Sequence, residues 1–322
     1  MHRFSQINRK GWFSVTNEFY FTSYDGASQL FAKEWSADEN PCAILLLVHD
    51  QSDRIERYDR FAEDLSACGI VVAGADLPGH GRSVSSSDDL GYFGDGKDMW
   101  SVIVEDIHIL RLLLQNKYPS TPVFVMGCGM GSFLVRSYIS QHCENLAGAI
   151  LCGTGNLSVP FVMAGLGIVA VDEKKFGPRH VSNRLHSMFF TSYNRRLSDT
   201  RTDFDWLSRD EAEIDKYMAD ESCGFPLTVS AYKTLFNGLL SSTSKKALAG
   251  VSPVLPIFLI SGACDPIGDN GRGVVKVSHA FQDSGLRKVT VKIYVGCRHD
   301  LLHDMNYQQV HSDIMTWIEN RL

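Results

Sequence analysis

The chain has 322 residues, of which 44% are hydrophobic and 21% are charged, and this composition excludes disorder, collagen and coiled coil. A single hydrophobic core reaches its upper size limit near this length, so we expect one large domain with an insertion or two unequal domains. The formal net charge is -6, and no run of Lys or Arg is longer than two residues. Because a phosphate backbone is bound by clustered positive charge, we expect no nucleic-acid partner.

The eight cysteines are scattered without a C-x-x-C pair, which favours a reducing compartment. Residues 1–13 contain basic side chains but no apolar segment of the kind found in signal peptides. The most apolar stretch, residues 157–171, is interrupted by Pro160 and two glycines and is shorter than the roughly 20 residues that span a bilayer. The expected location is therefore the cytoplasm, with no transmembrane segment.

The first predicted elements are two strands, residues 17–22 and 28–35, which Asp25-Gly26 joins as a hairpin. Short apolar runs follow, separated by amphipathic stretches of helix length, and this is typical of a mainly parallel sheet covered on both faces. One run, residues 289–295, instead alternates apolar and polar side chains, which favours a strand near the sheet edge. The uniformly apolar runs are residues 43–48, 70–75, 123–126, 149–152 and 257–260.

Apolar side chains at helical spacing predict helices over residues 103–114 and 310–318 that pack on the sheet. The alternation of strands and helices stops between residues 156 and 250, where aromatic residues such as Phe189, Phe190 and Trp206 are mixed with charge. We expect an α/β core formed by residues 1–155 and 251–322 with a helical cap inserted at 156–250. Residues 83–89 and 241–246 are predicted to be polar loops.

A glycine-rich segment follows the predicted strand at residues 123–126 and precedes a helical stretch at 133–140. A strand, a tight turn flanked by glycines and a helix form the context of the nucleophile elbow G-x-S-x-G. Here the segment reads Gly-Cys-Gly-Met-Gly, and its central residue is Gly129, which offers no nucleophile. Taken alone, the segment is equally consistent with a glycine turn that only allows close packing.

Five motifs in order along the chain resemble the alpha/beta-hydrolases of the monoacylglycerol lipase, lysophospholipase and serine aminopeptidase-like group. The resemblance implies that fold, a helical cap, and chemistry on monoacylglycerols, lysophospholipids or similar acyl esters. The sequence has no metal, nucleotide or flavin motif, so we expect no cofactor. It also places the catalytic acid at Asp265 and the base at His299. The motifs are Val48-His49 with Arg57-Tyr58-Asp59-Arg60-Phe61-Ala62, Asp76-Leu77-Pro78-Gly79-His80-Gly81-Arg82-Ser83, the turn at Gly129, Ser261-Gly262-Ala263-Cys264-Asp265-Pro266, and Tyr294-Val295-Gly296-Cys297-Arg298-His299-Asp300.

The chain departs from the family pattern at the nucleophile, where Gly129 stands in place of Ser and Cys128 in place of His. The backbone N–H groups of Gln51 and Met130 take the positions of the oxyanion hole, but Asp50 precedes Gln51 where the family has Gly. A negative charge at Asp50 would oppose a developing oxyanion. We therefore expect Gly129→Ser to restore little esterase activity and a second change, Asp50→Gly, to enlarge the gain.

The sequence offers two alternatives for the site. Cys128 is an alternative nucleophile, although it lies one residue early and a thiol also needs positioning and a lowered pKa. His299 and His303 have the spacing of a zinc-binding H-E-x-x-H helix, but a third ligand is missing and Gly296 favours a loop. The preferred interpretation has neither a metal nor a bound cofactor.

Three functions remain open from the sequence. The first is a catalytically silent hydrolase, a pseudoenzyme, that keeps a cap-covered apolar pocket for a small apolar or acyl-ester ligand. The second is a hydrolase or lyase-like enzyme in which the His299–Asp265 dyad acts as a general base without a serine. The third is a structural or assembly protein whose cap forms an interface, for example in a homo-oligomer.

Overall fold

A computed structural model describes residues 15–36, 40–94, 96, 98–197 and 200–322, and within these ranges the side chains of residues 189–192 and 196 are not described. Residues 1–13, where a signal peptide was sought, lie outside the described part. The described chain forms one eight-stranded sheet in the order β1-β2-β4-β3-β5-β6-β7-β8. Its strands are β1 (Val15–Thr22), β2 (Gln29–Ser36), β3 (Ala43–Val48), β4 (Ile70–Ala75), β5 (Val123–Cys128), β6 (Leu146–Cys152), β7 (Ile257–Gly262) and β8 (Val289–Tyr294).

The strands after β2 are parallel, and β1 and β2 form the antiparallel hairpin that the sequence predicts. The alternating strand β8 lies at the sheet edge, which confirms the prediction from its pattern. Successive residues of the buried strands point to opposite faces, so Ile44 and Leu46 join one apolar cluster while Leu45 and Leu47 join another. This two-sided burial explains why the strand sequences are uniformly apolar.

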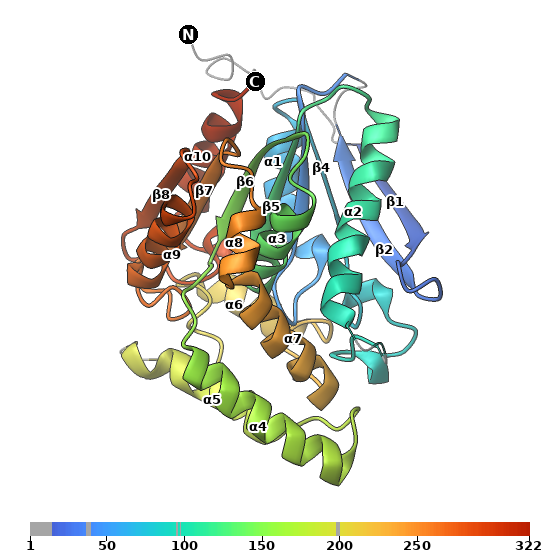
Figure 1. Cartoon of the computed structure of the whole chain (residues 1–322), viewed down its shortest axis with the longest axis vertical. Coiled ribbons are helices and arrows are strands. Elements are labelled where there is room, and N and C mark those ends of the chain that lie inside the picture. The colour runs from blue at the N-terminus through green and yellow to red at the C-terminus, as the bar shows by residue number, and fades with distance from the viewer. Residues whose placement is uncertain (1–14, 37–39, 95, 97, 198–199) are drawn as a thin grey trace.

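Helices cover both faces of the sheet (Figure 1). α2, α3 and α9 contribute to the first cluster, whereas α1 and α10 contribute to the second. The helices in chain order are α1 (Asp59–Ser66), α2 (Met99–Lys117), α3 (Met130–Gln141), α4 (Val159–Phe176), α5 (Asn183–Tyr193), α6 (Glu211–Ala219), α7 (Val229–Ser242), α8 (Lys245–Gly250), α9 (Arg272–Asp283) and α10 (Tyr307–Glu319).

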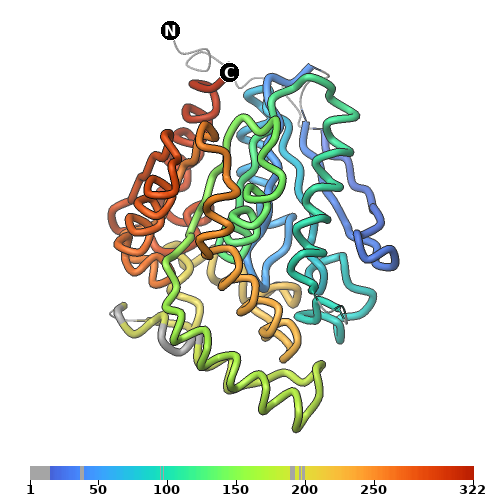
Figure 2. The backbone as a smooth tube through the Cα atoms, in the orientation of Figure 1, coloured from blue at the N-terminus to red at the C-terminus, as the bar shows by residue number. Residues whose placement is uncertain are grey.

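Between β6 and β7 the chain leaves the sheet and returns, as Figure 2 traces. The described residues of 156–250 include helices α4 to α8 and add no strand to the sheet. α4 and α5 lie together at the end of the molecule away from the C-terminus (Figure 1). α7 packs on α3 and α2 as well as on α4, so it joins this segment to the sheet layers.

The prediction of a polar loop at residues 241–246 is wrong in its extent. α7 continues to Ser242 and α8 begins at Lys245, which leaves two residues between the helices. The side chains of Thr243 and Ser242 bond to the carbonyl oxygen of Leu239 in the preceding turn, and Ser244 accepts a hydrogen bond from the Ala247 N–H as an N-cap. Polar side chains here end and start helices instead of forming a loop.

Candidate active site

The turn between β5 and α3 has the geometry of a nucleophile elbow. Gly129 has φ +49° and ψ -117°, a conformation that L side chains rarely adopt. A Cβ at Gly127 would lie 2.2 Å from the carbonyl oxygen of Gly131, and a Cβ at Gly131 would lie 2.3 Å from that of Val48. The flanking glycines are therefore required by the close approach of three backbone segments.

The two residues expected as acid and base meet at the carboxyl ends of β7 and β8. Asp265 is completely buried, and its Oδ1 accepts a hydrogen bond of 2.9 Å from Nδ1 of His299. The same Asp265 carboxylate accepts hydrogen bonds from the Ile267 N–H and the Ser261 hydroxyl. The carboxylate and the ring are thus held in the orientation that acid–base catalysis uses.

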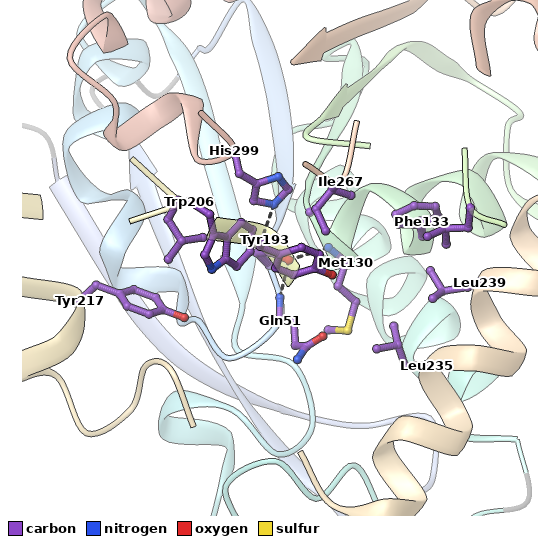
Figure 3. A pocket seen from close by; sticks show the side chains of 14 residues that line it. Gln51, Met130, Phe133, Tyr193, Trp206, Tyr217, Leu235, Leu239, Ile267 and His299 are labelled. Atoms are coloured by element: carbon purple, nitrogen blue, oxygen red, sulfur yellow. Dashed lines mark hydrogen bonds and ion pairs between the residues drawn. The ribbon is translucent and has the colours of Figure 1, made fainter. Parts of the chain in front are cut away.

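Asp50 places its carboxylate in the position where a substrate oxyanion would lie. Its Oδ1 accepts hydrogen bonds of 2.6 Å from the backbone N–H groups of both Gln51 and Met130. Its Oδ2 lies 3.1 Å from Nε2 of His299. In Figure 3, dashed lines lead from His299, Gln51 and Met130 toward a common centre. Both donors that would stabilise an oxyanion are already occupied by a carboxylate of the chain itself.

Gly129 makes room for this carboxylate. A Cβ at position 129 would lie 2.0 Å from Cγ of Asp50, well inside contact distance. A serine at 129 and the observed position of Asp50 therefore exclude each other. The two departures from the family pattern, Gly129 in place of Ser and Asp50 in place of Gly, therefore depend on each other. The side chain that is missing at the elbow leaves the space that the Asp50 side chain occupies.

The position of Asp50 determines the charge of His299. Burial by itself would lower the pKa of this imidazole, but the carboxylates of Asp265 and Asp50, one on each ring nitrogen, raise the pKa well above its ordinary value of 6.5. With a carboxylate beside each ring nitrogen and the pKa raised in this way, we expect the imidazolium form of His299, in which both nitrogens donate and no lone pair can remove a proton.

We expect the charge on His299 to appear in the pH dependence of stability. A His whose pKa is raised on folding adds stability below its unfolded value and loses it as the pH rises through the folded value. Asp50→Asn removes one ion pair, so the difference in unfolding free energy between parent and variant should shrink as the pH rises from neutral to alkaline. Urea unfolding at several pH values measures this, with the exposed Asp88→Asn as the control. A neutral His299 in the parent at pH 7, seen by NMR titration, would contradict it.

Cys128, the alternative nucleophile, does not line the pocket beneath the cap. Its thiol contacts Cys152, and this contact together with burial raises the pKa of Cys128 well above its ordinary value. The thiol is therefore protonated at neutral pH and is a weak nucleophile in this state. It faces a smaller cavity on the other side of the elbow, which Asp50 and His299 also line.

His299 and His303 do not share a helix face. His299 lies in the loop that precedes the short 3-10 helix Leu301–His303. The Nδ1 of His303 faces the carboxylate of Asp300, and its Nε2 lies 2.8 Å from the carbonyl oxygen of Arg57. Within the described ranges, no group of three or more His, Cys, Asp or Glu residues is placed to hold a metal ion.

A pocket opens above Asp50 and Gly129, with a cavity volume of about 70 Å³. Its floor carries Asp50, the elbow and His299, and its walls are mostly apolar (Figure 3). Trp206, whose ring lies 5.1 Å from that of His299, belongs to the segment expected as a cap. The remaining lining residues are Gln51, Met130, Phe133, Leu157, Tyr193, Leu207, Tyr217, Leu235, Leu239 and Ile267. The side chains of Phe189 and Phe190 lie outside the described residues.

The segment that follows Asp50 is tied to α6 and the residues after it. The carbonyl oxygen of Ser52 accepts hydrogen bonds from the Tyr217 hydroxyl and the Gly224 N–H, each at 2.9 Å. The Ser52 hydroxyl donates to the carbonyl oxygen of Phe225 at 2.6 Å. These three hydrogen bonds fix the backbone two residues after Asp50.

The sequence predicts Asp50 as a charge beside the oxyanion hole, and only the structure shows that its side chain enters the hole. The signal in the sequence is a reciprocal change: Asp where the family has Gly, and Gly where it has Ser. Arg57 is also part of the site, which the sequence does not predict. The guanidinium of Arg57 forms ion pairs with Asp53 at 2.9 Å and with Asp300 at 3.0 Å, which joins the segment after β3 to the loop that carries His299.

The chain is similar to several characterised proteins. It is 26% identical to the monoglyceride lipase of Rattus norvegicus over 299 residues, which cover 91% of this chain and 88% of the lipase. It is 25% identical to the monoacylglycerol lipase of Mycolicibacterium smegmatis over 309 residues, covering 96% and 99% of the two chains. Among solved structures, a thermostable carboxyl esterase of Bacillus coagulans in complex with glycerol superposes with a TM-score of 0.88 at 27% identity, covering 95% of this chain and 98% of the esterase.

These similarities, with the sheet order and the covering helices, confirm the predicted α/β-hydrolase fold. The described chain also contains no helix long and apolar enough to cross a membrane. The model of the family described as "Serine aminopeptidase, S33" matches residues 39–306. The chain therefore belongs to this family of hydrolases.

Proposed function

We propose that the chain does not hydrolyse carboxylic esters by the serine mechanism of its relatives and that it binds an apolar or acyl-type ligand in the pocket beneath the cap. The observation that carries the proposal is the carboxylate of Asp50, whose Oδ1 lies 2.6 Å from both backbone donors of the oxyanion hole. Acyl transfer requires these donors for the developing oxyanion. Loss of the nucleophile of a serine hydrolase costs on the order of a millionfold in turnover.

The character of the pocket supports the binding role. Leu235 and Leu239 of α7 and Phe133 of α3 present an apolar wall, while Asp50, Gln51 and His299 supply polar groups. Apolar pockets with a few polar groups at one end are typical of sites for amphiphilic ligands. The monoglyceride and monoacylglycerol lipases that the chain resembles are named for acyl ligands, which favours a chain-like guest here.

Two measurements on the purified chain test the proposal. Short-chain acyl esters should turn over no faster than in buffer, and a fluorophosphonate probe should leave the chain unlabelled. A fluorescent acyl reporter should bind and be displaced by neutral amphiphiles, and Leu239→Arg, which places a charge in the wall, should weaken its binding at least ~tenfold. The proposal that the chain does not hydrolyse esters would be overturned if it hydrolysed them at enzymatic rates and His299→Ala abolished this activity.

The general-base dyad is the less favoured function. For His299 to remove a proton from water, its Nε2 must first lose the proton that it donates to Asp50. The geometry at rest thus favours binding over proton abstraction by the dyad alone.

The cytoplasmic location, the lack of a nucleic-acid partner and a homo-oligomer formed through the cap remain proposals. The eight cysteines are scattered without a C-x-x-C pair, which supports a reducing compartment. Cell fractionation tests the location. Light scattering of the parent and of a variant with a charge on α4, Met163→Glu, tests the oligomer, since Met163 is exposed.

A further inference from the structure

The carboxylate of Asp50 has a reactive side as well as a bound side. Its Oδ1 is held by two backbone N–H groups, while its Oδ2 lies 3.1 Å from Nε2 of His299. The side chain is 20% exposed and Asp50 lines the pocket, so a guest in the pocket can reach it. A fixed, accessible carboxylate is one of the groups that form covalent intermediates in enzymes.

We propose that Asp50 is a catalytic nucleophile that displaces halide from the terminal carbon of an alkyl halide bound in the pocket, and that His299 then hydrolyses the resulting alkyl ester. This activity goes beyond the proposed binding role, because it assigns a reaction to the same pocket. It is compatible with the absence of ester hydrolysis, since the bond that is attacked lies at a saturated carbon.

The occupied oxyanion hole selects this chemistry. An acyl ester that reacted with Asp50 would need donors for its own oxyanion, and the two available donors, Gln51 N–H and Met130 N–H, already bind Oδ1. Displacement at a saturated carbon creates no oxyanion. Halide departs as a stable anion without requiring a proton, and the reaction needs no partner besides water. The apolar wall of the pocket suits an alkyl chain.

In the first step, Oδ2 of Asp50 forms a bond to the terminal carbon and the carbon–halogen bond breaks, with its electron pair leaving on the halide. The product is a neutral alkyl ester of Asp50, whose carbonyl oxygen Oδ1 stays between the N–H groups of Gln51 and Met130. The ester removes the negative charge next to His299. Because Asp50 is one of the two charges that hold the His299 pKa high, the imidazolium then releases its Nε2 proton to solvent more readily.

In the second step, water attacks Cγ of the ester while Nε2 of His299 accepts its proton, and Asp265 stabilises the imidazolium through Nδ1. The negative charge develops on Oδ1, between the two backbone donors that already hold it. When the tetrahedral intermediate collapses, His299 returns the proton to the departing alcohol. The protonated Asp50 carboxyl that remains gives its proton to His299, which restores the ion pair. The sum is alkyl halide plus water to alcohol plus hydrogen halide.

Gly129 supports this assignment independently of the hydrogen bonds. The missing Cβ at 129 opens the space in which the Asp50 carboxylate lies, because a Cβ there would lie 2.0 Å from Cγ. The Asp50 carboxylate thus lies among the turn at Gly129, the Asp265–His299 pair and the two backbone donors, where the family has its serine. If the Asp50 carboxylate only blocked the site, the buried Asp265–His299 pair would have no catalytic role.

Decyl bromide serves as the probe, and bromide release by the full chain is the first measurement. We expect catalytic release, reduced at least ~hundredfold in Asp50→Asn and unchanged in the matched control Asp88→Asn, which removes an exposed carboxylate that does not line the pocket. His299→Gln should permit the first step but not the second. This variant should release one equivalent of bromide and carry a decyl group on Asp50, located by fragmentation of the tryptic peptide 34–54.

A second measurement uses the unaltered chain and does not depend on the folding of any variant. After a single turnover in water labelled with heavy oxygen, the label should be in the carboxylate of Asp50 and not in the decanol, because water attacks Cγ. Three results would each overturn the inference. They are label in the alcohol alone, a decyl group on Cys128 instead of Asp50, and no bromide release although the acyl reporter still binds. The last outcome leaves the proposed binding function standing, whereas failure of the reporter to bind contradicts that function alone.

Discussion

The double variant Asp50→Gly/Gly129→Ser is expected to hydrolyse short acyl esters about a thousandfold or more faster than the parent chain. Glycine at position 50 frees the N–H groups of Gln51 and Met130 for a substrate oxyanion, and it removes one of the two carboxylates that keep His299 charged. Serine at 129 then stands on an elbow whose backbone already has the required turn. A chromogenic butyrate ester measures the gain.

The single variant Gly129→Ser should show no such gain, because its Cβ would meet Cγ of Asp50 at 2.0 Å. Its unfolding free energy should also fall by about 1–3 kcal/mol, as expected for overpacking in a buried site. Asp50→Gly alone should remain inactive for lack of a nucleophile. Activity in the double variant that survives His299→Ala would show that the restored serine does not use the acid–base pair.

Arg57→Met is expected to lower the unfolding free energy by about 3–5 kcal/mol, the largest stability effect at this site. Arg57 pairs with Asp53 and Asp300, whose side chains are only 3% and 14% exposed. Removing the guanidinium leaves two carboxylates together without a cation between them. The ion pair Arg272–Asp269 is the matched control, since its side chains are 68% and 42% exposed and Arg272→Met should cost only about 0–1 kcal/mol.

The destabilisation by Arg57→Met should depend on pH with a known sign. Burial alone would raise the pKa of Asp300, but His303 and Arg57 overcome it and hold that pKa well below the ordinary value. The corresponding stability is present above the pKa of the unfolded chain and is lost as the pH falls through the folded value. Urea unfolding should therefore show the difference between parent and variant shrinking in acid. A difference that stays constant down to acid unfolding would rule out the ionic explanation.

The same guanidinium lies 4.8 Å from the ring centre of Tyr217 in α6. Tyr217 in turn donates to Ser52 two residues after Asp50. Arg57 thus connects the loop of His299, the segment of Asp50 and helix α6. Its loss should weaken ligand binding as well as stability.

The sequence by itself determined the fold class, and the family resemblance of its motifs predicted that Asp265 and His299 come together as acid and base. Uniformly apolar strands, an alternating edge strand and motifs in a fixed order suffice, because each is a local pattern read along the chain. Asp265 and His299 each follow a strand, and the carboxyl ends of neighbouring parallel strands meet at one edge of the sheet. Their contact at 2.9 Å is a consequence of topology.

Only the tertiary structure decided what Asp50 does. The sequence predicts only that the Asp50 charge opposes a nearby oxyanion and that Gly129→Ser restores little esterase activity. The direction of the Asp50 side chain depends on donors and space supplied 80 residues away, by Met130 and Gly129. A pattern read along a few neighbouring residues cannot show contacts between residues so far apart in the sequence. The contacts arise because β3 and β5 lie side by side in the sheet. They place the Asp50 carboxylate in the oxyanion hole, pair His299 with two carboxylates, and make Asp50 incompatible with Ser at 129.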